Sequence, residues 1–181
     1  TMIGHYAGHQ LTTADSTTFV GYEAGYNCIS GPRNTAIGYQ ALYKSNANTH
    51  GDTYANNTAV GSGAGYHGGG VTGYGGNVYV GQNTGHGHVG GKSTFVGQTA
   101  GRFAASGSDN VGIGNDTLAA YHKTDLTSTG GKIVAIGNQA MKSCDMQLSV
   151  AVGYGALSSA SGSGQRLVAM GYSAAGNVVN P

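Results

Sequence analysis

A short phrase built around one glycine recurs ten times along this chain, and it constrains the fold more than any other feature. In most copies a β-branched residue, a variable residue and Val or Ile precede the glycine. Two variable residues and then Ala or Thr follow it, as in Thr-Ala-Ile-Gly-Tyr-Gln-Ala-Leu at residues 35–42 and Thr-Ala-Val-Gly-Ser-Gly-Ala-Gly at residues 58–65. A fixed-period repeat predicts a solenoid, in which each unit buries its apolar side chains against its neighbours.

The repeats run through residues 1–181, which predicts one repeat array and a single all-β domain, a β-solenoid (β-roll or β-helix) of about ten coils. Steps of 16 to 23 residues separate successive repeat glycines, so insertions fall between the units, where a solenoid tolerates them. Residues 177–181 read like the opening of another unit, and we expect a segment of a longer fibre. The repeat glycines are Gly4, Gly21, Gly38, Gly61, Gly81, Gly97, Gly114, Gly137, Gly153 and Gly171.

The composition excludes several classes of protein. Charged residues make up 8% of the chain, against a usual ~25%, and the net charge is +1 without a basic run, so the sequence gives no basis for nucleic-acid binding. Glycine accounts for 35 of 181 residues but does not occupy every third position, which excludes collagen. No apolar run reaches ~18 residues, so we expect no membrane insertion.

Each predicted strand carries two sets of side chains that point in opposite directions. With the Val or Ile before the glycine as position zero, positions minus two and zero share one side, and position minus one faces the other. The former, here called the flanking residues, are almost all β-branched, which predicts that they form the packed interior. The latter, the centre residues, are small or aromatic and never charged, so we expect copies of the chain to bury them in an interface, most simply in a parallel homotrimer. The centre residues of this predicted inter-chain face are Phe19, Ala36, Ala59, Tyr79, Phe95, Ala135, Ala151 and Ala169.

Several copies resemble the repeats of surface fibres. Residues 18–25 and 34–42 (Asn-Thr-Ala-Ile-Gly-Tyr-Gln-Ala-Leu) are similar to the arrays of bacteriophage tail-fibre-like proteins. Residues 134–137 and 150–153 resemble, more loosely, the head repeats of trimeric autotransporter adhesins. The resemblance covers essentially the whole chain and implies a parallel homotrimer, outside a cell or on a virion surface, that serves as a shaft or for attachment. We therefore expect a structural or attachment fibre segment whose main partner is itself.

Two other interpretations differ in assembly or chemistry. Exposed solenoid ends invite strand addition, so an extracellular filament of chains stacked head to tail is the main alternative assembly. Residues 37–42 also match the hexapeptide of left-handed β-helix acyltransferases. In those enzymes three hexapeptides follow one another in each coil, whereas here a long polar stretch follows a single one, so we do not expect an acyltransferase.

One His-x-His pair, His86 and His88, lies in a glycine-rich stretch. In a trimer, six imidazoles could meet at the axis and bind a transition metal, because imidazole is a suitable ligand for iron, nickel or zinc. The alternative is two loop histidines in solvent. Apart from this candidate site, the sequence predicts no cofactor.

Four tyrosines share one place in the repeat, directly after the glycine. Exposed rings in a column could stack on sugar rings, which makes a cell-surface glycan a candidate partner; the alternative is that the rings cover an apolar edge. A single-chain module that binds glycan or ice is thus an alternative function, although regularly spaced threonines favour ice binding only on an outward face. The glycan-contact candidates are Tyr22, Tyr39, Tyr154 and Tyr172.

The sequence does not predict an enzyme. No two of its acidic residues form an obvious close pair, and it has neither a Gly-x-Ser-x-Gly elbow nor a phosphate-binding loop. Cys28 and Cys144 lie several coils apart, too far for an intrachain disulfide in a straight solenoid. Asn56 and Asn115 begin N-glycosylation sequons, which matter only if the source glycosylates.

Overall fold

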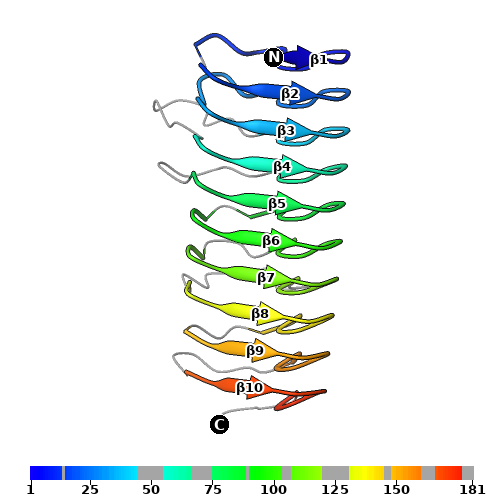
Figure 1. Ribbon diagram of the computed structural model, residues 1–181, viewed down its shortest axis with the longest axis vertical. Helices are drawn as coiled ribbons and strands as arrows, with labels where there is room; N and C mark the ends of the chain where they lie inside the picture. Colours follow the sequence, from blue (N-terminus) through cyan, green and yellow to red (C-terminus); the bar gives the residue numbers. More distant parts are fainter. Residues whose placement is uncertain are drawn as a thin grey trace.

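The computed structural model describes residues 1–13, 15–44, 55–66, 75–88, 90–102, 107–119, 131–144, 148–159 and 166–176. They form ten parallel strands in one sheet, stacked in the order of the sequence with one strand in each coil (Figure 1). The described part contains no helix, hence none that could cross a membrane. The predicted all-β solenoid is confirmed. The strands are β1 (Met2–Ile3), β2 (Thr18–Val20), β3 (Thr35–Ile37), β4 (Thr58–Val60), β5 (Val78–Val80), β6 (Thr94–Val96), β7 (Val111–Ile113), β8 (Val134–Ile136), β9 (Val150–Val152) and β10 (Val168–Met170).

Neighbouring strands keep the same repeat positions side by side. Thr35 of β3 pairs with Thr58 of β4 although 23 residues separate them, and Thr18 of β2 pairs with Thr35 after only 17. Insertions between units therefore leave the register unchanged. The turns beside the strands are stacked in the same way, since the Gly25 amide donates to the Ala41 carbonyl at 2.8 Å in the next coil.

The repeat glycine is required for two reasons. Gly38 has a φ of +136°, a conformation that side chains rarely allow. A Cβ added there would lie 2.5 Å from the carbonyl oxygen of Gly61 in the next coil. Because that neighbour is backbone within the sheet, it cannot move aside without breaking the stack.

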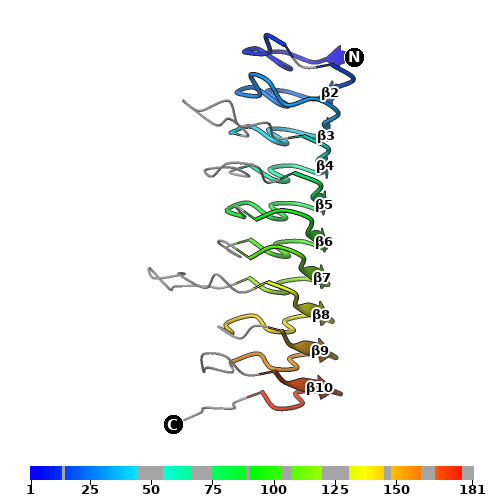
Figure 2. The same cartoon turned by 90° about the vertical axis from the view of Figure 1, so that its left-hand side faces the viewer.

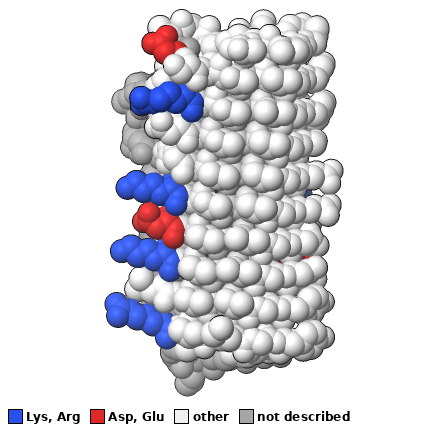
Figure 3. Space-filling model, in the orientation of Figure 1, with Lys and Arg blue, Asp and Glu red and all other residues white. Residues whose placement is uncertain are grey.

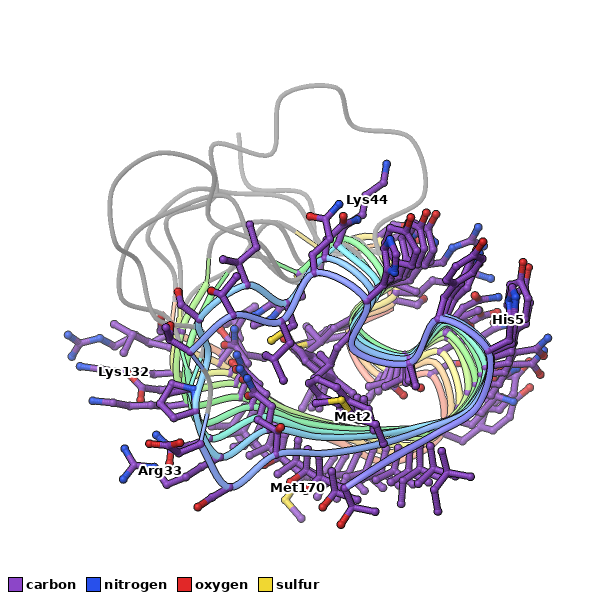
Figure 4. All side chains as sticks on the ribbon, turned by 90° about the horizontal axis from the view of Figure 1, so that it is seen from above. Met2, His5, Arg33, Lys44, Lys132 and Met170 are labelled. Atoms are coloured by element: carbon purple, nitrogen blue, oxygen red, sulfur yellow. The ribbon has the colours of Figure 1, made fainter. Side chains whose placement is uncertain are left out.

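The interior and exterior of the coil are reversed relative to the expectation from β-branching. Phe19 and Phe95 are completely buried within one chain, whereas the flanking residues Ile37 and Ile113 each keep 40% of their surface exposed. In Figure 4, the centre residue Met2 points into the coil and the flanking residue Met170 points away from it. The predicted inter-chain face is therefore the intramolecular core, and that prediction was wrong. The buried centre residues are Phe19, Ala36, Ala59, Tyr79, Phe95, Ala135, Ala151 and Ala169.

The narrow interior explains why the centre residues vary in size. Each centre residue has a counterpart six positions later in the chain, on the opposite wall of the coil. A Cβ on Gly25 would lie 2.6 Å from the Phe19 ring, so a large centre residue requires glycine there. Where the centre residue is Gly112, the counterpart is Leu118, whose side chain reaches within 3.3 Å of an added Cβ. β-branched residues, in contrast, are favoured by the extended backbone on either side of a strand, so they do not indicate which side is buried.

A column of buried polar residues lies at position minus three, just before strands β2–β7 and β9. Asn34 accepts hydrogen bonds from the backbone amide of Asn57 at 2.9 Å and from its side-chain amide at 3.2 Å. The Asn57 side chain accepts in turn from the amide of Asn77 at 3.0 Å, and Asn77 from that of Ser93 at 2.9 Å. Each side chain thus satisfies a backbone donor of the next coil, as a buried corner requires.

Candidate functional site: strand face and aromatic columns

Two columns of flanking residues cover the outer face of the sheet, which forms one side of the coil (Figure 2). Among the residues that the structure describes, no charged side chain lies over the strands; the basic and acidic side chains that this view shows line one edge (Figure 3). Figure 4 places Arg33 and Lys132 at that edge. The result is an uninterrupted uncharged face along the solenoid. In β2–β10 its two columns are Thr18, Thr35, Thr58, Val78, Thr94, Val111, Val134, Val150 and Val168, and Val20, Ile37, Val60, Val80, Val96, Ile113, Ile136, Val152 and Met170.

The face changes in character along its length. Threonine occupies position minus two in β2, β3, β4 and β6, whereas valine occupies it in β5 and in β7–β10. Position zero is aliphatic or Met throughout β2–β10. Hydroxyl groups are therefore confined to one column of β2–β6, and the face over β7–β10 is wholly apolar.

A first aromatic column follows the repeat glycines. His5 stacks on Tyr22 and Tyr22 on Tyr39, both with ring centroids 5.6 Å apart. Tyr154 and Tyr172 form a separate pair at 5.3 Å. The four predicted tyrosines do share one column, but the structure brings them together only as two pairs. The coils between the pairs carry Ser62, Gln82, Gln98, Asn115 and Asn138 at this position.

Stacking limits what these rings can bind. The planes of Tyr22 and Tyr39 lie within 10° of parallel, and those of Tyr154 and Tyr172 within 9°. A sugar ring cannot enter such a gap, because it would need full van der Waals distance on both sides. The predicted stacking of sugars on ring faces is therefore not available between paired rings, which present their edges and hydroxyl groups to the outside.

A second aromatic column escaped the sequence analysis. His9, Tyr26, Tyr43, Tyr66 and His86 form an unbroken stack with centroid distances of 4.9 to 5.2 Å. Each of these residues lies five positions after a repeat glycine. Aligning the units on that glycine, with His and Tyr counted together, would have shown the column.

A carboxylate lies among the two columns. Glu23 accepts a hydrogen bond from the Gln40 side-chain amide at 2.7 Å, one coil further on. Its charge is the main cause of a raised pKa at Tyr22, whereas partial burial is the main cause at Tyr43 and Tyr66. These phenols therefore stay protonated and remain hydrogen-bond donors well above neutral pH.

The structure separates the two histidines of the predicted metal site. His86 ends the second aromatic column, stacked on Tyr66, whereas His88 lies fully buried inside the coil. The Gly107 carbonyl at 3.0 Å accepts from His88 Nε2, so Nδ1 is left to accept from the Tyr79 hydroxyl at 2.8 Å. Burial lowers the pKa of His88 to about 4. A site at a trimer axis needs both imidazoles on the outside, so the expected geometry was wrong for His88.

Other chemically active groups stay dispersed. Among the described residues, no three His, Cys, Asp or Glu side chains gather in a group that could hold a metal ion. Asp116 accepts from the Thr99 hydroxyl and from Lys142 Nζ at 3.2 Å, and these contacts, the Thr99 bond first, hold the pKa of its carboxyl below the usual value. Cys28 is buried, Cys144 is half-buried, and neither forms a disulfide.

Comparison of the chain with family models, with curated proteins and with solved structures finds no match in any of the three.

Proposed function

We propose that this chain is a structural or attachment segment of an extracellular or virion-surface fibre, and that copies of it cover its strand face in a parallel homotrimer. The observation that supports the proposal most is the continuous uncharged face of flanking residues. Val80 and Ile136 expose 36% and 38% of their surface there, and Met170 exposes 71% at the last described strand. Soluble monomers rarely expose a contiguous apolar surface of this kind.

The shape of the face supports self-association in parallel register. Its columns repeat at every coil, about 4.8 Å apart, so a parallel copy meets equivalent residues along the whole length. A closed, symmetric arrangement buries all copies of the face equally, whereas an antiparallel pair would set the hydroxyl-bearing N-terminal end against the wholly apolar C-terminal end. The resemblance of the repeats to tail-fibre and trimeric adhesin arrays supports threefold symmetry. The proposed role is not catalytic, and the chain itself is the main partner.

Sedimentation velocity of the purified chain tests this proposal. We expect a trimer at micromolar concentration. A variant with Ile113→Lys and Ile136→Lys should be monomeric with an unchanged circular dichroism spectrum, because the exposed lysines disrupt only the interface. The matched control, Gln98→Lys with Asn138→Lys, places the same charges on exposed side chains away from the strand face and should still be a trimer. A wild-type monomer, or a trimer that survives both lysines on the face, would contradict the proposal.

The outward direction of the threonines favours one second candidate, ice binding by a single chain. Thr18, Thr35 and Thr58 lie on successive strands of an uncharged face, as a surface that orders water against a lattice would require. Thermal hysteresis measurements on wild type and on Thr35→Lys with Thr58→Lys separate the two functions. Hysteresis that the lysines abolish would favour ice binding, and its absence in the wild type would eliminate it.

A further inference from the structure

The two aromatic columns and one ring between them form a continuous surface on the first five coils. Tyr6 packs edge-on against His5 of the first column at 3.9 Å and against His9 of the second at 4.9 Å. Beyond the coil of β5, the second column continues with Arg102, Ala119, Lys142 and Ser158. We call this the aromatic surface, and it comprises His5, Tyr6, His9, Tyr22, Tyr26, Tyr39, Tyr43, Tyr66 and His86.

The aromatic surface offers ring edges and hydrogen-bonding groups in alternation. Stacking covers most ring faces, so phenol hydroxyls, imidazole nitrogens and ring edges face outward beside His5 (Figure 4). Glu23 and Gln40 add a carboxylate and an amide between the columns. Hydroxyl groups that both donate and accept, next to apolar edges, are suited to a ligand rich in hydroxyls.

The surface repeats once per coil, which favours a polymer over a small molecule. The second column has ring spacings of 4.9 to 5.2 Å. An extended polysaccharide with equatorial linkages advances by about one pyranose ring per sugar, a length comparable with the ~4.8 Å separation of the coils. Such a chain laid along the axis would meet an equivalent ring edge and hydroxyl at each sugar.

The charged side chains near the aromatic surface favour a neutral polymer over an anionic one. Glu23 lies among the rings. Two described cations lie next to them: Lys44, 5.8 Å from the Tyr66 ring centre, and Arg102, which follows His86 in the second column. The arginine and lysine side chains at the edge of the strand face lie on another side of the coil (Figure 4). The described cations do not recur at every coil, so a sulfated or phosphorylated chain would lack a cation for each sugar and would meet the Glu23 carboxylate, whereas a neutral chain meets no charge conflict.

We propose that the aromatic surface binds a neutral, extended, equatorially linked polysaccharide that lies parallel to the solenoid axis, with one sugar per coil. The inference rests on the proposed attachment function and names the class of ligand for it. In an assembly that covers the strand face, the aromatic surface stays open, because it lies on a different side of the coil: His5 and Met170 point in different directions (Figure 4).

Isothermal titration calorimetry with oligosaccharides of equal length tests whether the spacing of the sugars must match the spacing of the coils. Cellohexaose and chitohexaose are extended, whereas maltohexaose has axial linkages and coils, so its sugars do not match the coil spacing. We expect heat of binding from at least one extended ligand at millimolar concentration and none from maltohexaose. Absence of binding by both extended ligands, or equal binding of maltohexaose, would overturn the inference.

Paired tyrosine variants test the location. Tyr26→Phe with Tyr43→Phe keeps the stack and removes two hydroxyls, and it should weaken binding of the extended ligand by about tenfold. The matched control, Tyr154→Phe with Tyr172→Phe, removes two hydroxyls outside the aromatic surface and should bind like wild type. Unchanged binding in the first variant, or an equal loss in the control, would place the ligand elsewhere and contradict the proposal.

The two proposals can fail independently. Sedimentation of the Tyr26→Phe, Tyr43→Phe variant should still show a trimer, and titration of the Ile113→Lys, Ile136→Lys monomer should still show sugar binding. A trimer that binds none of the oligosaccharides contradicts the inference alone. A wild-type monomer that binds an extended oligosaccharide contradicts the proposed assembly alone.

Discussion

The inner and outer sides of the same strands follow different rules. Inside, the centre residue varies from Gly112 to Tyr79, and a counterpart across the narrow coil compensates its size. Outside, position zero is always Val, Ile or Met in β2–β10. An interior can vary from coil to coil as long as each coil is filled, because only the total volume is fixed. The extended backbone accounts for β-branching on the exterior, and the lack of charge there is what the proposed self-association would require along the whole length.

Truncation of one large residue on each side is the strongest test of this contrast. Phe95→Ala should reduce the free energy of unfolding by about 3 to 5 kcal/mol, because Phe95 is fully buried and its counterpart is Gly101, which cannot fill the cavity. Ile37→Ala in the Ile113→Lys, Ile136→Lys background, which we expect to be monomeric, should reduce it by less than about 1 kcal/mol, because 40% of Ile37 is exposed. Urea denaturation followed by circular dichroism measures both. Similar losses would mean that the outer side is also an intramolecular core.

Low pH should destabilise the fold by protonating a residue in the interior of the coil. Folded chains keep His88 neutral down to a pKa of about 4, whereas the unfolded chain takes up a proton near pH 6.5. Between these values the unfolded state binds more protons, so stability falls as the pH drops from about 6.5 to about 4, by up to about 3 kcal/mol. Thermal denaturation across this range measures the loss. His88→Gln should remove most of the pH dependence, and His86→Gln, at the outer column, should retain it.

Two amide ladders allow the same comparison for hydrogen bonds. Asn57→Ala removes the acceptor of the Asn77 amide and the side-chain donor to Asn34, although its backbone amide still donates to Asn34, and it should reduce stability by about 1 to 3 kcal/mol. Gln98→Ala removes an exposed side-chain hydrogen bond to Gln82 and should change stability by less than about 0.5 kcal/mol. Chemical denaturation of the two variants provides the measurement. Equal effects would show that water replaces the lost hydrogen bonds equally well in the buried and the exposed ladder.

Size compensation inside the coil predicts a rescue. Phe19→Ala leaves a cavity, and Gly25→Leu alone places a Cβ 2.6 Å from the Phe19 ring, so each single change should destabilise the fold. The double variant should recover to within about 1 kcal/mol of wild type, because Leu42 and Leu118 already hold this turn position with a φ of 52°. A double-mutant cycle measures the coupling. Simple addition of the two losses would show that the walls of the coil do not compensate each other.

The aromatic surface shows how far the sequence could be interpreted. The shared position of Tyr22 and Tyr39 after the repeat glycine predicted a column, and the structure contains that pair. The role of the rings as stacking platforms could not follow from position alone, because it depends on whether neighbouring rings cover each other. The second column was missed because two of its members are histidines, although His9 and His86 occupy the same repeat position as the tyrosines; the stacking of the rings is seen only in the structure.

The sequence by itself determined the solenoid, its register and the need for glycine after each strand. These features follow from local periodicity, and insertions between units do not alter them, as the pairing of Thr35 with Thr58 shows. Only the tertiary structure decided which side of each strand faces inward. Both sides of a three-residue strand are apolar here, so hydrophobicity does not distinguish them. The opposite wall does: it leaves room for Phe19 beside Gly25 and for Leu118 beside Gly112, and that fit exists only once the chain has closed into a coil.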